Sequence, residues 1–245
     1  MKRFLLILLF VSALVEGLLA QVYTQSESSD LKLHSGFDVG LRLSPRWHLG
    51  WAEEIYMKND MRDRDRYYSR VTLTYNNGRH LQVAPMLLMV NIRNSASPED
   101  QFIADLNFYY TIRAGRWSFT LREAPRLKYS GGVGGESFEA APEWLLRSHL
   151  ATTCRLADRV TAFANAEVFN MLSAPHYIQN LYIQRFRSNV GLKYAFDRHN
   201  ALSLYWRYDH TLSKQATLYE EGRLESVNTR HSLNNMVGVF YYLSF

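Results

Sequence analysis

Apolar and polar residues alternate along most of the chain, from about residue 31 to its end. The clearest stretch is 232–245, in which most odd positions from Leu233 to Phe245 are apolar, while Ser232, Asn234 and Gly238 lie between them. A period of two residues is typical of a β-strand with one apolar face. About ten tilted residues cross the hydrocarbon of a membrane, so this stretch is long enough for a membrane-spanning strand.

Ten upstream segments repeat the alternation and are separated by clusters of turn residues. The expected strands are 31–42, 47–57, 67–75, 81–89, 102–111, 117–126, 146–155, 160–168, 185–196, 202–209 and 232–245. Short turns alternate with longer loops along the chain. The short turns include Ser44-Pro45-Arg46 and the hairpin signal Asn77-Gly78, and the longest loop is 211–229.

This asymmetry predicts an all-β fold, a transmembrane antiparallel up-and-down β-barrel with short periplasmic turns and longer extracellular loops. Bacterial barrels of this kind have an even number of strands. A twelfth strand at 22–29 would complete the set, so we expect about twelve strands, with ten as the alternative. Segment 22–29 otherwise threads the lumen from below.

The first residues predict export. Lys2 and Arg3 precede an apolar run from Phe4 to Val15, and a small residue, Ala20, ends the segment. This pattern indicates a secretory signal peptide at 1–20, which leaves a single barrel domain at 21–245 in the outer membrane of a Gram-negative cell. The run is short for a membrane anchor. With one cysteine, Cys154, no internal disulfide forms, and we expect this thiol to face lipid.

Alternation alone does not say which face is outside, because a soluble exported lipocalin-like binding barrel has the same period with its apolar face inward. That alternative places Leu106, Phe108, Leu204 and Trp206 inside. Two features favour the membrane. Aromatic residues lie near the strand ends, as interfacial girdles require: Trp47, Tyr67, Tyr75, Tyr110, Trp117, Tyr194, Phe196 and Tyr208. The chain also has 22 Arg against 6 Lys, and the planar guanidinium suits a crowded, paired interior.

With the polar positions turned inward, charged residues gather in the lumen, with more bases than acids. The predicted lumen network consists of Asp38, Glu54, Arg70, Asp105, Arg122, Arg147, Glu167, Arg185, Arg187, Arg207 and Asp209. Arginine–carboxylate pairs are strong in a partly dry interior. We expect a charged, partly filled lumen whose network is structural, because a barrel of ten to twelve strands is narrow.

Several features of the sequence resemble those of a known family. The features concerned are Trp47, the pair Glu53-Glu54, the mid-strand Arg70, Arg122, Arg147 and Arg187, the segment 164–170 and the terminal Phe245. They resemble the uncharacterised bacterial outer-membrane β-barrel family catalogued as domain of unknown function 2490. The resemblance implies the barrel fold and the outer-membrane location, and no mechanism.

The chain end also resembles the C-terminal assembly signal of outer-membrane proteins, carried here by Gly238, Tyr241, Leu243 and Phe245. The resemblance implies recognition by the barrel-assembly machinery during biogenesis. Outer-membrane lipid and lipopolysaccharide are the other expected partners, the latter through the rim bases Arg62, Arg64 and Arg66. Nucleic acid is not expected of an exported chain with membrane-strand alternation.

No complete catalytic constellation is found. The glycine run at 130–135 lacks the Lys-Ser/Thr of a phosphate loop, the eight histidines lack metal-ligand spacing, and no Gly-x-Ser-x-Gly motif occurs. We therefore expect no catalytic residues, cofactor or metal, and a structural or surface role or limited solute passage. The rival is an outer-membrane hydrolase with Asp209 and His210 at the extracellular rim.

Overall fold

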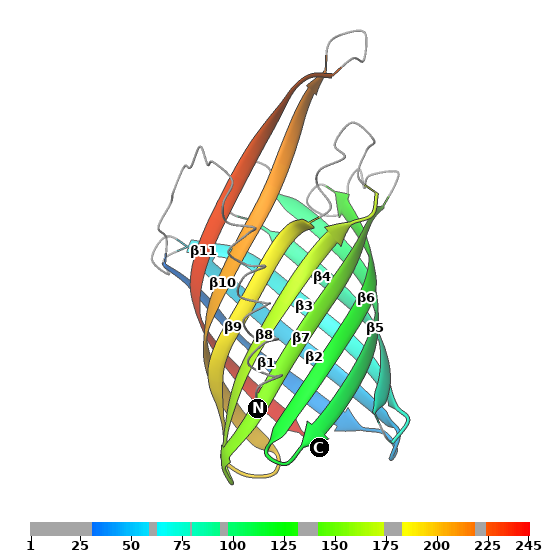
Figure 1. Cartoon of the computed structure of the whole chain (residues 1–245), viewed down its shortest axis with the longest axis vertical. Coiled ribbons are helices and arrows are strands. Elements are labelled where there is room, and N and C mark those ends of the chain that lie inside the picture. The colour runs from blue at the N-terminus through cyan, green and yellow to red at the C-terminus, as the bar shows by residue number, and fades with distance from the viewer. Residues whose placement is uncertain are drawn as a thin grey trace, which may run out of the picture.

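In the computed structural model, the described residues form eleven strands that close into a barrel (Figure 1). They are β1 (Leu31–Arg42), β2 (Trp47–Lys58), β3 (Asp63–Asn76), β4 (Leu81–Ile92), β5 (Glu99–Ala114), β6 (Trp117–Gly131), β7 (Glu143–Ala157), β8 (Val160–Met171), β9 (Ile183–Ala195), β10 (Asn200–Leu218) and β11 (Leu224–Ser244). The structure describes residues 31–58, 63–78, 80–93, 98–131, 142–173, 183–218 and 224–245. Among them, no helix is long and apolar enough to cross a bilayer.

Each strand pairs antiparallel with the next along the chain, and the barrel closes where β1 pairs with β11 in parallel, from Leu31↔Asn235 to Gly40↔Ser244. An odd number of alternating strands leaves two neighbours running the same way. The eleven expected segments are all strands, but a count of twelve or ten and a wholly antiparallel sheet are wrong for the described residues. The expected signal peptide 1–20 and strand 22–29 lie outside them.

The shortest connections lie at one end of the barrel, called the lower end here, together with the C-terminus (Figure 1). Two of these turns contain a glycine in the left-handed region, Gly78 at φ 83° and Gly115 at φ 61°. Only glycine adopts this conformation at no steric cost, so these residues permit the tight reversals. The Asn77-Gly78 turn was expected from the sequence, and Gly115 lies between the expected strands 102–111 and 117–126.

At the upper end the strands run further than the alternation predicts. The expected loop at 211–229 is largely a hairpin, because β10 and β11 stay paired as far as Leu218↔Leu224. Figure 1 shows this hairpin rising above the other strands. Above the apolar band a strand needs no alternation, since backbone pairing alone extends it. The alternation of apolar and polar residues therefore ends before the strand does.

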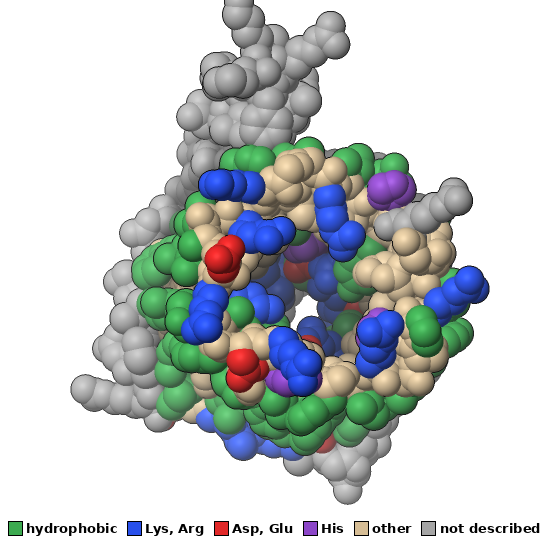
Figure 2. Space-filling view, turned by 90° about the horizontal axis from the view of Figure 1, so that it is seen from below, with side chains coloured by type: hydrophobic (Ala, Val, Ile, Leu, Met, Phe, Trp, Pro, Cys, Tyr) green, Lys and Arg blue, Asp and Glu red, His purple; other side chains and the backbone are tan. Residues whose placement is uncertain are grey.

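The outer surface of the barrel is apolar and its interior is charged. Leu106, Phe108, Leu204 and Trp206 are between 40% and 56% exposed, whereas Asp105 is only 4% exposed. The soluble-barrel alternative, which required those four residues inside, is inconsistent with this arrangement. Cys154 lies opposite Trp117 on the outer face. A view from below shows an opening in the barrel, rimmed by basic and acidic side chains (Figure 2).

Candidate functional site

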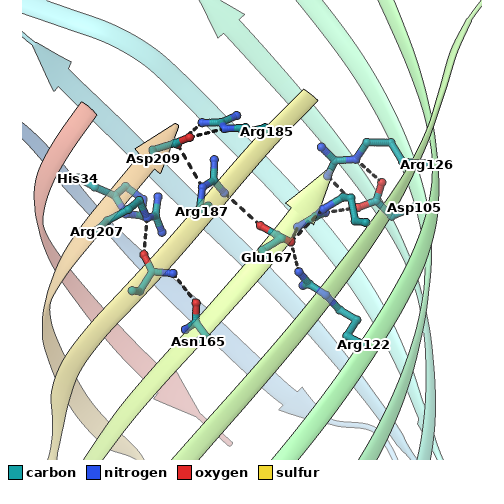
Figure 3. A network of polar contacts seen from close by, with 12 residues as sticks. His34, Asp105, Arg122, Arg126, Asn165, Glu167, Arg185, Arg187, Arg207 and Asp209 are labelled. Atoms are coloured by element: carbon teal, nitrogen blue, oxygen red, sulfur yellow. Dashed lines mark hydrogen bonds and ion pairs between the residues drawn. The ribbon is translucent and has the colours of Figure 1, made fainter. Parts of the chain in front are cut away.

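A continuous chain of ion pairs crosses the inner wall from β5 to β10, and we call it the arginine belt (Figure 3). Its members are Asp105, Arg122, Arg126, Arg147, Glu167, Arg185, Arg187 and Asp209. Alternation turns each of them inward, and the register brings them to neighbouring positions, for example Asp105↔Arg126 and Glu167↔Arg187.

Each carboxylate of the belt bridges at least two guanidinium groups. Asp105 accepts from Arg126 Nε at 2.6 Å and Nη2 at 2.8 Å, and from Arg147 Nη1 at 2.5 Å. Glu167 accepts from Arg147 Nη2 at 2.5 Å. Such charge-assisted bonds, in part bidentate, are the strong class of hydrogen bond in proteins.

The belt continues toward β10 through the same kind of bridge. Glu167 also accepts from Arg122, and from Arg187 Nη1 at 3.5 Å. Arg187 Nε donates in turn to Asp209 at 3.2 Å, and Arg185 Nε donates to Asp209 at 2.6 Å. Asp209 is fully buried behind these two arginines. Every carboxylate of the belt is thus held by guanidinium groups from neighbouring strands.

The aromatic ring of Phe169 lies against the guanidinium groups of the belt. The residue is 5% exposed and its ring lies under four guanidinium groups, those of Arg126, Arg147, Arg185 and Arg187, with centroid distances between 5.2 and 5.9 Å. The face of an aromatic ring attracts cations, more strongly where water is excluded. One ring therefore helps hold four like charges near one another.

On the facing wall, β1 to β3, two carboxylates share one arginine and one histidine. Arg70 donates to Asp38 at 3.0 Å and lies 3.5 Å from a Glu54 oxygen, and His34 Nε2 lies 3.1 Å from the other Glu54 oxygen. Asp38 and Glu54 thus share Arg70, and a second arginine of this wall, Arg66, lines the upper cavity. The belt sets five guanidinium groups against three carboxylates. The excess of positive charge among these ion pairs therefore lies in the belt.

Two further cations lie below the belt. Arg207 donates to Asn189 Oδ1 at 2.6 Å and to the Tyr56 hydroxyl at 2.8 Å, and its guanidinium group lies over the rings of Tyr56 and Tyr205. Lys193 Nζ lies 3.9 Å from the ring centroid of Tyr242. Within the described ranges no carboxylate forms a salt bridge with Arg207 or Lys193. Both cations are therefore in contact with neutral groups and not with a carboxylate.

Two cavities occupy the lumen. The lower one, about 250 Å³, is lined by residues that include Arg207, His34 and Glu167. The upper one, about 270 Å³, is lined by belt arginines and by side chains from β3 and β4. Both are near the small end of ordinary ligand pockets. The lumen thus has room for small molecules between charged walls.

All eleven residues of the expected lumen network lie on strands and on the inner face. Ten of them, together with Arg126, join in ion pairs on two walls, and Arg207 stands apart from carboxylates. Arg126 and Phe169 are part of the site but were not in the expected set. Arg126 has the parity of Arg122, a signal that would have found it. Phe169 has the inward parity of Glu167, but it lies just beyond the expected strand 160–168, and an apolar side chain was not a candidate for a charged network.

The hydrolase candidates do not converge. Asp209 points inward to Arg185 and Arg187, whereas His210, the next residue in the strand, points outward, with Nε2 3.2 Å from Nδ1 of His231. Successive strand residues face opposite sides, so this pair cannot serve as one acid–base site. The described residues contain no cluster of three or more His, Cys, Asp and Glu able to hold a metal ion.

The expected assembly-signal residues divide between the two faces. Tyr241, Leu243 and Phe245 lie on the outer face, and Gly238 lies inside, directly under the ring of Tyr205. Of the expected rim bases, Arg62 lies outside the described residues and Arg64 is exposed. Arg66 lines the upper cavity, and contact of these bases with lipopolysaccharide stays a prediction.

Comparisons with known proteins identify the family of this chain. Among curated proteins none matches the chain. A solved structure described as the NanC porin in a rhombohedral crystal form is 12% identical, with a TM-score of 0.46, and the match covers 86% of this chain and 98% of that one. The sequence profile of the family described as "Protein of unknown function (DUF2490)" matches residues 35–219. Because this match spans most of the sequence, the chain belongs to the DUF2490 family.

Proposed function

We propose that this chain is an integral outer-membrane barrel without enzymatic activity, whose narrow, positively charged lumen allows limited passage of small anions. The observation that carries the proposal is the charge of the lumen, namely the excess of guanidinium groups in the arginine belt together with Arg207 and Lys193, which have no carboxylate partner among the described residues.

The outer face supports the membrane location. Large apolar side chains are exposed around the barrel, and buried charged ones such as Asp105, Glu167 and Asp209 lie inside. Aromatic residues next to the lower turns form a girdle there: Trp47 packs on Tyr75 with 5.0 Å between ring centroids, and Tyr194 packs on Phe196 with 5.2 Å. Such rings are enriched where a barrel meets the membrane–water interface.

The size of the lumen supports limited rather than free passage. Barrels of about eight strands are filled by side chains, and those of sixteen or more leave an aqueous channel. A barrel of eleven strands lies between these cases, and here the long arginines of the belt narrow it further. A net positive charge in such a passage raises the local concentration of anions.

Fractionation tests the location. The expressed protein is expected in the outer-membrane fraction, extractable only with detergent, and its gel mobility is expected to change on heating, as for other membrane barrels. A protein recovered from the periplasm without detergent, with one gel mobility before and after boiling, contradicts the proposal.

Planar-bilayer recording tests the passage. Small currents with a modest preference for chloride over potassium are expected. Replacing Arg207 and Lys193 together, Arg207→Gln with Lys193→Gln, is expected to weaken that preference, because it removes two positive charges from the lumen and leaves only the excess of the arginine belt. Arg46→Gln, in the exposed turn between β1 and β2, is the matched control and is expected to leave the preference unchanged. Large, stable, cation-selective currents contradict the proposal.

A further inference from the structure

Strand β4 is apolar on its inner face as well as on its outer face. Met86, Leu88 and Val90 point inward and, with Ile103 of β5, form a buried cluster against which Tyr68 and Ile92 pack. We call Met86, Leu88, Val90 and Ile103 the apolar wall. The interior of a membrane barrel that merely holds water is polar. A wall of this kind therefore points to an occupant with an apolar part.

The apolar wall lines the upper cavity, and the arginine belt lines the same cavity. Arg126, Arg147, Arg185 and Arg187 border it, whereas Asp105, Glu167 and Asp209 do not. Because the belt carboxylates lie behind their arginines, a molecule in the cavity meets guanidinium groups on that side. Lys128 also borders it, paired with Glu143 at 2.8 Å, and Glu54 is the other acid on the lining.

We infer that the upper cavity binds a small amphipathic anion, with its acidic group on the arginine belt and its apolar body on the apolar wall. The inference deepens the proposed function and rests on it for the sign of the charge. A guanidinium group matches the planar, two-oxygen geometry of a carboxylate. The volume of about 270 Å³ equals that of roughly nine water molecules, enough for a short-chain carboxylic acid.

The affinity of the upper cavity is expected to depend on the length of the ligand's alkyl chain. Each methylene group buried against the apolar wall is expected to tighten binding by up to about fourfold, the equivalent of the free energy of burying one CH₂. The affinity of an anion held only by the positive charge of a hydrated lumen would not rise with the length of its alkyl chain. The slope of affinity against chain length therefore separates a built site from general attraction of anions.

The experiment measures the binding of acetate, butanoate and hexanoate to the folded protein in detergent by ligand-observed NMR titration, with empty micelles as the blank. The dissociation constant is expected to fall at each step of the series, by about two- to fourfold per methylene. Butylamine and hexylamine hydrochlorides are expected to bind at least tenfold more weakly than the acids of equal length. Equal affinity along the acid series, or equal binding of acids and amines, overturns the inference.

Two variants locate the site. Leu88→Asn is expected to remove most of the chain-length dependence, and Leu88→Met, which stays apolar and of similar volume, is expected to keep it. Met86→Gln repeats the test if Leu88→Asn does not reach the folded gel mobility. An unchanged slope in the folded polar variant overturns the placement on the apolar wall.

Failure of the inference and failure of the proposed function give different results. A flat acid series in a protein whose bilayer currents prefer chloride removes the amphipathic site and leaves the anion passage intact. Cation-selective currents remove the passage, and a chain-length slope shared by acids and amines would then describe an apolar cavity without charge selection.

Discussion

Glu167→Ala is expected to lower the thermal midpoint of the detergent-solubilised barrel far more than Glu53→Ala does. Glu167 is 3% exposed and is the one belt carboxylate that bridges three arginines, Arg122, Arg147 and Arg187. Removing it leaves these guanidinium groups close together with their shared partner gone. The loss of one partner from a buried ion pair costs about 3–5 kcal/mol.

Glu53 provides a matched control because it is also a strand glutamate with hydrogen-bond partners. It lies on the outer face of β2 and accepts from Trp51 Nε1 at 2.7 Å and from Ser69 Oγ at 2.8 Å. Its removal leaves neutral donors and no uncompensated charge, so a loss of about 1 kcal/mol is expected. The fraction of unboiled, folded protein on a gel, measured against temperature, compares the two variants. Equal midpoints would mean that the belt residues merely line water.

Much of the fold is predictable from the sequence. In a barrel that is apolar outside and polar inside, alternate residues of each strand are apolar and polar. Asp105, Arg147 and Glu167 have the inward parity in strands whose other face is apolar, and each lies inside. The same alternation predicts all eleven strands and the turns at Gly78 and Gly115. These features depend on local pattern and local backbone conformation.

Other features depend on contacts between distant strands, and the alternation does not contain them. The parallel pairing of β1 with β11 joins residues about two hundred positions apart. Strand β4 carries Leu87 outside and Leu88 inside, so its inner face departs from the polar pattern that alternation predicts. Arg207 shares the inward parity of Asp209, yet nothing in the sequence says that its partners are Tyr56 and Asn189 rather than a carboxylate.

Gly238 has two explanations, and they predict different results. In the sequence it belongs to a resemblance to the C-terminal assembly signal, which implies recognition by other proteins. In the structure a Cβ at Gly238 would overlap the ring of Tyr205, its partner across β10 and β11. Tyr205 is 8% exposed, is hydrogen-bonded to His34 and packs edge-on against Phe163, so the ring has little freedom to move.

Gly238→Ala is therefore expected to destabilise the barrel even when it is refolded from denaturant into detergent without any assembly machinery. Overpacking of this kind costs about 1–3 kcal/mol. Tyr205→Ala is expected to be destabilising as well, because it leaves a cavity and deprives His34 of a partner. In the double variant the added methyl group enters the space that the ring has left, so the two losses are expected to sum to more than the double variant loses, by at least about 1 kcal/mol.

Thermal midpoints of the wild type, the two single variants and the double variant complete the cycle. Gly40→Ala is the matched control, because Gly40 also faces inward near a chain end, but a Cβ there meets atoms only at 3.9 Å. It is expected to refold like the wild type. If the Gly238 and Tyr205 effects simply add, or if Gly238→Ala refolds normally in detergent and fails only in cells, the glycine is required by the assembly machinery and not by the ring above it.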